Sequence, residues 1–306
     1  MTNYIGQIHY SNNTPERGVD LHTHSNASDG DFTPRQLVLE AKKRGVGAIA
    51  LTDHDTLDGL ESAENEAKAC GIRFIRGIEL NINRAGEYIP NAPGLGPGGE
   101  FHLLGLGINS PSPAFLNAVA GLAASREKRN LEILERMHEL NMEASWEEVL
   151  ALSGGVCVGR LHFAALLVRK KIARNLDQAF TRYLRIGMPL YVPKTGLSFT
   201  EAAALIRESG GIPVLAHPMS LYIAWGRLTD MLTALKDRGL MGIEAWHPSA
   251  KPKACRRLEE LGKKLGLYIT EGSDFHGPAR PDRELGRSNR GRVIDGSVLE
   301  AIPELN

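Results

Sequence analysis

Short apolar runs alternate with longer amphipathic stretches along most of the chain. Helical patterns separate several of these runs, at about 57–70, 199–209, 228–238 and 252–265. Strands that alternate with helices are typical of parallel sheets joined by crossover helices, so the pattern predicts an α/β fold. The apolar runs with the length and residue types of buried β-strands are 18–22, 47–53, 74–80, 101–108, 212–217, 241–246 and 267–274.

One helix start is marked clearly. Thr33 is a residue type favoured at the N-cap, Pro34 is favoured at the first helical position, and Gln36 stands three residues after the cap. The sequence therefore predicts a helix that begins at Pro34.

The alternation stops in the middle of the chain, where helical patterns follow one another without strands. This part includes the charged run SREKRNLEILERMHEL. We therefore predict a discontinuous barrel domain over 18–110 and 190–290, a substrate-capping helical insertion over 111–189, and an N-terminal extension over 1–17.

Composition narrows the class of protein. The 306 residues are 42% hydrophobic and carry 36 basic and 36 acidic side chains, so no overall positive charge favours long double-stranded nucleic acid. The three cysteines form no CxxC pair, which argues against a thiolate metal site and a disulfide framework. Because neither an export signal nor a membrane span is evident, we expect a cytoplasmic protein. The oligomeric state stays open.

Histidines and carboxylates gather at the ends of the predicted strands. His22 and His24 stand two residues apart in VDLHTHSNASDG, so on a strand their side chains point to the same side. Such a pair alone is often incidental. The other apolar runs, however, also end or begin with metal-ligand residue types, and parallel barrels build their functional face at the carboxyl ends of their strands. The set is His22, His24, His54, Glu79, His102, His217, Asp274 and His276.

These residue types indicate the kind of metal. Imidazole and carboxylate ligands without thiolate suit Mn²⁺, Fe²⁺ or Zn²⁺, and so many ligands exceed the coordination of one ion. The sequence predicts a multinuclear centre. We interpret His138, Asp53 and Asp55 as structural, with the two aspartates as candidates to orient His54.

Six motifs in order give the chain a resemblance to a known family. DLHTHSNASDG, ALTDHD, GIEL, HLLGLGI, LAHP and GSDFHG resemble those of the PHP (polymerase and histidinol phosphatase) superfamily. GRLHFA and YVP further resemble its subgroup of 3′,5′-nucleotide bisphosphate phosphatases and 5′→3′ exoribonucleases of short RNA. The resemblance implies a distorted (β/α)7 PHP barrel with an inserted helical subdomain and a trinuclear centre, usually of Mn²⁺.

The resemblance also implies which residues bind each metal. One ion would take His22, His24, Glu79 and Asp274; a second Glu79, His102 and His217; a third Asp29, His54 and His276. Periodicity alone does not indicate Asp29, which stands in a stretch that otherwise reads as a plain turn. Glu79 would bridge two ions. Glu79, Asp274 and His276 are the expected catalytic residues.

Two segments depart from the family pattern. The Gly/Pro-rich segment 84–100 contains GLGPGG, but no Lys-Ser/Thr pair or helix start follows, so we interpret it as a rim loop rather than a phosphate-binding loop. Related sequences commonly carry a histidine where this chain has Ala250. His247 is the candidate replacement, which leaves its phosphate contacts open.

Further residues are candidates for substrate binding. Arg160 and His162 lie near the start of an apolar helix, where guanidinium and helical amides favour phosphate, although a surface arginine and a buried histidine are the alternative. Arg126 and Arg129 either reach a terminal phosphate or form a solvated face. Trp246 either stacks on a base or packs in the barrel. The expected substrate-binding residues are Arg160, His162, His247 and Arg129.

Three classes of function follow. The leading one is a hydrolase, a metal-dependent phosphoesterase that removes the 3′-phosphate from nucleoside 3′,5′-bisphosphates, or a 5′→3′ exonuclease on short 5′-phosphorylated RNA. The second is a small-molecule phosphatase resembling histidinol phosphatase, which the helical insertion disfavours. The third is a non-catalytic accessory domain, which the intact ligand set disfavours.

Overall fold

A computed structural model describes residues 18–83, 99–153, 157–278 and 280–305. The N-terminal extension expected at 1–17 and most of the Gly/Pro-rich segment 84–100 lie outside these residues.

Seven strands form one sheet in sequence order, and it curves into a barrel. A parallel bridge between Thr23 and Phe275 joins the segment after the first strand to the segment after the last. The family-based expectation of a distorted seven-stranded barrel is therefore confirmed. The strands are β1 (Val19–Asp20), β2 (Ala48–Leu51), β3 (Arg73–Asn81), β4 (His102–Leu106), β5 (Ile212–Leu215), β6 (Gly242–Trp246) and β7 (Tyr268–Glu271).

The expectation of an all-parallel sheet is wrong at β4, which runs antiparallel to both β3 and β5. An antiparallel pair needs no crossover helix. The reversal also places the amino end of β4 at the rim where the other strands end. His102, its first residue, therefore reaches the same rim as the residues that follow the other strands.

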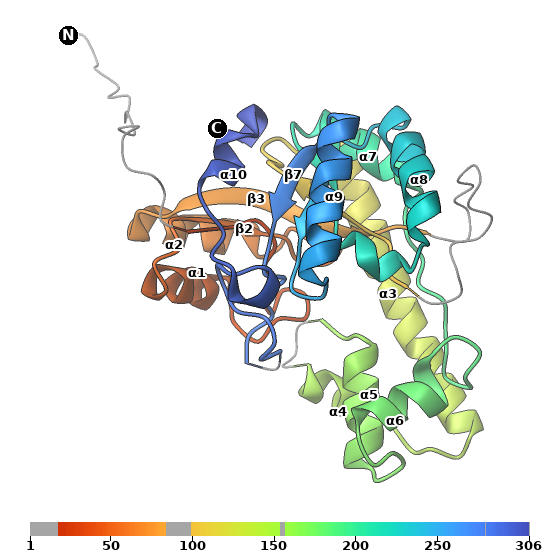
Figure 1. Cartoon of the computed structure of the whole chain (residues 1–306). Helices are drawn as coiled ribbons and strands as arrows, with labels where there is room; N and C mark the ends of the chain where they lie inside the picture. Colours follow the sequence, from red (N-terminus) through yellow and green to blue (C-terminus); the bar gives the residue numbers. More distant parts are fainter. Residues whose placement is uncertain (1–17, 84–98, 154–156, 279, 306) are drawn as a thin grey trace.

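Helices cover the outside of the barrel (Figure 1). The Thr33 hydroxyl accepts a hydrogen bond from the Gln36 N–H, and the Gln36 side chain accepts one from the Thr33 N–H, so the predicted capping box is present. Such a cap contributes about 1 kcal/mol to helix stability. The outer helices are α1 (Pro34–Lys43), α2 (Leu60–Cys70), α7 (Phe199–Glu208), α8 (Trp225–Asp237) and α9 (Pro252–Leu265).

The C-terminal segment contributes to the interior of the barrel. Leu299 in α10 (Ser297–Glu300) and Leu305 in the 3₁₀ turn Pro303–Leu305 are buried in the same hydrophobic cluster as Val19, Ala48 and Leu104. An Arg73 side chain contacts the backbone carbonyl of Leu305. The C-terminal segment thus covers one end of the barrel with apolar side chains. The polar residues lie at the opposite rim.

A helical region lies below the barrel in Figure 1. The first half of α3 packs in the barrel's large core through Phe115 and Leu122, whereas its second half packs in a separate core through Ile133 and Met137. The long helix therefore connects two cores. The helices here are α3 (Pro113–Glu139), α4 (Trp146–Leu152), α5 (Arg160–Arg169) and α6 (Leu176–Ala179), followed by a π-helical turn (Phe180–Leu184).

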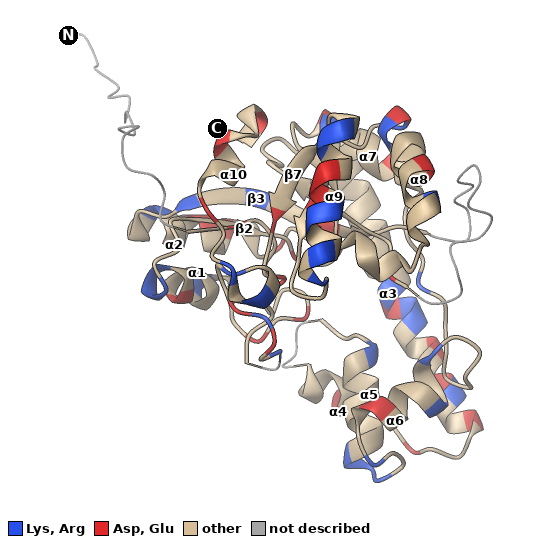
Figure 2. Ribbon diagram, viewed as in Figure 1, with Lys and Arg blue, Asp and Glu red and all other residues tan. Residues whose placement is uncertain are grey.

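Charged side chains of both signs are interspersed over the outer helices, as α9 shows in Figure 2. This distribution agrees with the balanced composition. Among the described residues, no helix combines the length and the apolar character needed to cross a membrane.

Candidate metal centre

Glu79 lies at the middle of a buried group of histidines at the barrel rim. Its Oε2 atom lies 3.3 Å from Nε2 of His22 and 3.3 Å from Nε2 of His24. Its Oε1 atom lies 2.9 Å from Nδ1 of His102 and 2.9 Å from Nε2 of His217. Oε2 also lies 3.1 Å from Nδ1 of His54. The two oxygens thus face different groups of histidines, as a carboxylate between two ions would.

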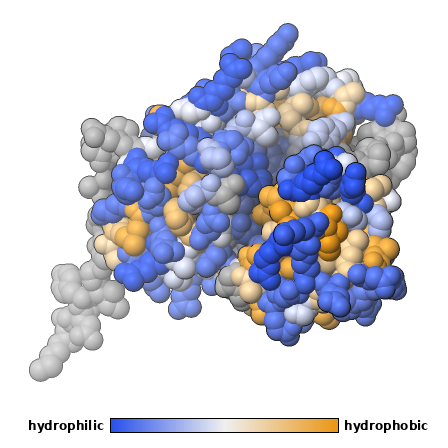
Figure 3. All heavy atoms as spheres, turned by 90° about the horizontal axis from the view of Figure 1, so that it is seen from below, coloured by the Kyte–Doolittle hydropathy of each residue, from blue (hydrophilic) through white to orange (hydrophobic). Residues whose placement is uncertain are grey.

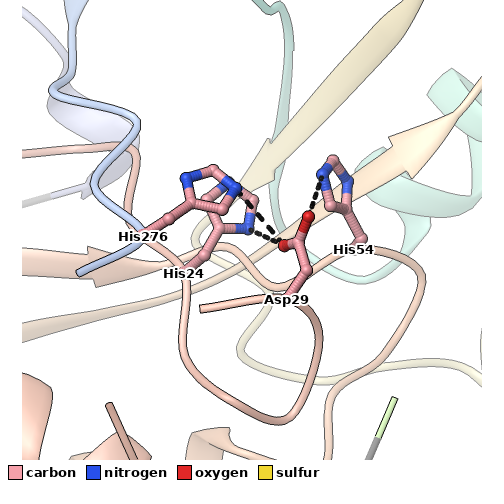
Figure 4. Close-up of side chains that lie close together, drawn as sticks. All are labelled: His24, Asp29, His54 and His276. Atoms are coloured by element: carbon pink, nitrogen blue, oxygen red, sulfur yellow. Dashed lines mark ion pairs between the residues drawn. The ribbon is translucent and has the colours of Figure 1, made fainter. Parts of the chain in front are cut away.

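Asp29 gathers a second group (Figure 4). Its Oδ1 atom lies 3.3 Å from Nε2 of His276 and 3.9 Å from Nδ1 of His24, and its Oδ2 atom lies 3.9 Å from Nε2 of His54. The four side chains can present ligand atoms within 4.8 Å of one another. His24, expected in the first group alone, also faces this one.

Asp274 completes the arrangement from the end of β7. Its Oδ1 atom lies 3.5 Å from Nε2 of His22 and 3.2 Å from Nε2 of His24. Asp274 has a φ of 51° and His217 a φ of 28°, conformations that cost about 1–3 kcal/mol in residues other than glycine and cluster at functional sites. The structure therefore brings all nine expected ligands to one rim.

Neighbouring oxygens orient three of the imidazoles. Nδ1 of His22 lies 3.0 Å from Glu244 Oε1, and Nδ1 of His217 lies 2.7 Å from Ser220 Oγ. Nδ1 of His276 lies 2.7 Å from the Asp274 carbonyl oxygen. An Nδ1–H donated to an oxygen leaves the Nε2 lone pair for a metal. In each case Nε2 faces the carboxylates of the site.

Several buried nitrogens have no hydrogen-bond partner among the described residues: His22 Nε2, both ring nitrogens of His24, and His54 Nδ1. Leaving buried polar atoms unpaired is costly, and a bound cation would remove that cost. Burial lowers the pKa of His54 to about 3, which keeps the imidazole neutral and leaves the lone pair of one ring nitrogen free. Burial opposes the charge on Glu79, but the facing histidines still hold its pKa well below the ordinary value. The residues present therefore fit metal ions.

The neighbouring aspartates do not orient the His54 ring, contrary to expectation. Asp53 accepts hydrogen bonds from Ser25 and Ser28, and Asp55 binds the Asn81 side chain at 2.6 Å and Arg126 Nη2 at 2.7 Å. They fix the neighbouring loop and an arginine instead. His138 Nε2 lies 2.7 Å from the Ala144 carbonyl, away from the site, as the structural interpretation predicts.

A cavity of about 370 Å³ opens from the metal-ligand group and extends to the helical region. Viewed from below, a hollow with hydrophilic side chains lies between the barrel and the helices (Figure 3). Besides all the expected ligands except His22 and His24, its lining includes Arg126, Arg129, Cys157, Arg160, His162, Phe180, Lys194, Tyr222, His247, Arg280 and Arg283.

The arginines of α3 are not a solvated face. Arg129 is 7% exposed, and its Nε has no hydrogen-bond partner among the described residues. Burial lowers the pKa of Arg129 to about 10, and repulsion from Arg160 and Arg126 adds to the effect. Arg160 is half-buried and forms no ion pair with the described residues. Neither Arg129 nor Arg160 therefore forms an ion pair with a carboxylate of the described residues.

Of the other candidate substrate-binding residues, some lie at the cavity and one does not. His162 lines the cavity, and its Nδ1 accepts a hydrogen bond from the Gly159 N–H, which fixes the start of α5. His247 Nε2 lies 3.1 Å from Asp274 Oδ2, so it stands beside the metal ligands, while Ala250 is buried in the barrel core. Trp246 does not line the cavity. It packs in the core beneath Arg292, which excludes the base-stacking interpretation.

Three side chains, two that line the cavity and one that lies behind the metal-ligand residues, were not predicted. Glu244 is 1% exposed, and the repeated tripeptide Gly-Ile-Glu at Glu79 and Glu244 could have indicated it. Lys194 Nζ lies 2.8 Å from Asn81 Oδ1, and Arg283 contacts the Asp274 carboxylate. Both basic residues stand in loops where no periodic pattern marks them.

A family model of the PHP domain matches residues 20–189, more than half of the chain. The chain belongs to the PHP family. The resemblance seen in the sequence motifs is thereby confirmed. Relatives that match most of this chain are named as an exoribonuclease, a nucleoside bisphosphate phosphatase and a cyclic phosphate diphosphodiesterase.

The PHP relatives include two bacterial enzymes. The 5′-3′ exoribonuclease Rnm of Salmonella typhimurium is 33% identical over 88% of this chain and 88% of its own length. The 3′,5′-nucleoside bisphosphate phosphatase of Chromobacterium violaceum is 30% identical over 88% of this chain and 91% of its own length. A solved amidohydrolase from the same organism, with bound sulfate and no metal, is 27% identical and covers 89% of this PHP chain and 91% of its own, with a TM-score of 0.77.

Proposed function

We propose that the chain is a metal-dependent phosphoesterase that removes the 3′-phosphate from nucleoside 3′,5′-bisphosphates and degrades short 5′-phosphorylated oligoribonucleotides from the 5′ end. One observation carries this proposal: metal-ligand residues and unpaired arginines line the same cavity. A substrate with two phosphates fits both. The names of the two relatives support the same substrates.

The proposed centre binds three metal ions, preferentially Mn²⁺, with Fe²⁺ or Zn²⁺ as alternatives. The first ion has His22, His24, Glu79 and Asp274, the second Glu79, His102 and His217, and the third Asp29, His54 and His276. When bound, such ions supply positive charge to phosphoryl oxygens and lower the pKa of water. Glu79, Asp274 and His276 are the catalytic residues because they hold the ions next to the reacting phosphorus.

The helical region 111–189 caps the substrate in this proposal. Arg129 and Arg160 bind the non-reacting 5′-phosphate, with His162 beside them, while the 3′-phosphoryl group or the first internucleotide phosphate lies at the rim. On the barrel side, His247 and Arg283 border the reacting phosphate. We also propose a cytoplasmic location, supported by the free cysteines Cys70, Cys157 and Cys255.

Metal content tests the centre directly. Purified without chelator and supplied with Mn²⁺, the protein is expected to hold about two to three transition-metal ions per chain, because its ligands exceed what one ion uses. Elemental analysis gives the ratio. A value at or below one contradicts the trinuclear centre.

A turnover panel with Mn²⁺ tests the substrate. Adenosine 3′,5′-bisphosphate and 5′-phosphorylated oligoribonucleotides are expected to react at least about 10-fold faster than AMP or histidinol phosphate, because only they engage both ends of the cavity. Rates of phosphate or nucleotide release are measured at limiting substrate. Preference for histidinol phosphate favours the small-molecule phosphatase, and no turnover of any substrate by metal-loaded protein favours an accessory role.

A further inference from the structure

Glu244 contacts two of the proposed metal ligands, one through each carboxylate oxygen. Its Oε1 atom lies 3.0 Å from Nδ1 of His22, and its Oε2 atom accepts a hydrogen bond of 2.7 Å from the backbone N–H of His217. Glu244 lies on β6, whereas the two histidines follow β1 and β5. The carboxylate therefore connects ligands from two other strand ends.

The contact matters for His217 because its backbone is strained. With a φ of 28°, this residue occupies a conformation that persists only where the surroundings impose it. Glu244 holds the backbone N–H, and the Ser220 hydroxyl lies 2.7 Å from the ring Nδ1. Together they direct Nε2 to within 2.9 Å of Glu79.

Packing keeps the Glu244 carboxylate in place. The backbone of β7 passes so close that a Cβ built on Gly272 would lie 2.7 Å from Glu244 Oε1 and 2.3 Å from the His22 Cβ. Only glycine allows this approach. The carboxylate is thus enclosed between His22, His217 and the β7 backbone, and it does not line the cavity.

We propose that Glu244 is a positioning residue for two metals at once, orienting His22 for the first ion and His217 for the second. This inference rests on the proposed trinuclear centre. It assigns no contact between Glu244 and the third group of Asp29, His54 and His276. Loss of one Glu244 oxygen therefore weakens two sites and spares the third.

The test is Glu244→Gln, which keeps the shape of the side chain. Glutamine offers only one oxygen acceptor for two donors, the His22 ring Nδ1–H and the His217 backbone N–H. The Mn²⁺ affinity of two sites is expected to fall about 10-fold, the usual effect of losing a partner of a metal-bound histidine, while the third site keeps its affinity. Equilibrium dialysis with elemental analysis measures the isotherm. The matched control is Glu271→Gln, a buried carboxylate on β7 that binds Ser288 and Arg292, and its isotherm is expected to equal that of the wild type.

Failure of the role of Glu244 and failure of the trinuclear centre give different binding results. Wild-type affinity at all three sites in Glu244→Gln overturns the proposal. Equal weakening of all three sites also overturns it, because Glu244 would then support the fold as a whole. A wild-type chain that binds at most one ion contradicts the trinuclear centre itself, and the inference falls with it.

Discussion

Replacing Glu79 by glutamine is expected to lower kcat/KM for adenosine 3′,5′-bisphosphate by several hundred-fold or more. Glu79 is 1% exposed. One of its oxygens faces His22, His24 and His54, and the other faces His102 and His217. Removing one partner of a buried ion pair costs about 3–5 kcal/mol, or roughly 10²- to 5 × 10³-fold. Because Glu79 would serve two ions, its neutralisation should affect activity more than the loss of any single histidine.

The measurement is steady-state kinetics together with elemental analysis of the same preparation. Glu79→Gln should lose bound metal as well as activity, and single histidine variants provide the comparison. Glu271→Gln is the matched control, since it neutralises a buried strand carboxylate outside the ligand group. Activity near that of the wild type in Glu79→Gln would falsify the bridging assignment.

Arg160→Ala is expected to impair only substrates that carry a 5′-phosphate. A charge-assisted contact contributes about 1.5–3 kcal/mol, so kcat/KM for adenosine 3′,5′-bisphosphate should fall roughly 10- to 100-fold. Turnover of 3′-AMP, which lacks the 5′-phosphate, should barely change. Metal content should stay constant, because arginine is not a ligand.

Arg169→Ala is the control, since Arg169 lies at the other end of α5, is half-exposed, and does not line the cavity. Its kinetics should match those of the wild type with both substrates. Equal losses for the bisphosphate and 3′-AMP in Arg160→Ala would show that Arg160 contacts the reacting phosphate or supports the fold. The proposed substrate orientation would then be wrong.

The local hydrophobic pattern of the sequence predicted where the strands and helices lie better than it predicted the directions of the strands in the sheet. All seven apolar runs contain strands, and the capping residues of α1 marked its start correctly, because both signals arise from neighbouring residues. The reversal of β4 was not predicted, since strand direction depends on how distant segments pair. Once known, it explains why His102 opens its strand whereas Glu79 stands near the end of its own.

The residues of the candidate site were likewise predictable only in part. Ligand residue types at strand ends indicated a multinuclear centre, whereas Asp29 came only from the family resemblance. The burial of Arg129 could not be read from its charged run, because the segment from Cys157 to Arg160, distant in sequence, covers it. Arg126 Nη1 lies 2.7 Å from Cys157 Sγ, and the Asn130 side chain donates to the Val158 carbonyl.

The order of the ligands along the chain has a consequence for how the protein matures. His22 and His24 are synthesised well before Asp274 and His276, which follow β7, so two of the three proposed ion sites stay incomplete until the segment after β7 has left the ribosome. The second site waits for His217. In the proposed centre, metal loading would therefore follow barrel closure, and the ion acquired would depend on which metals are available to the folded barrel.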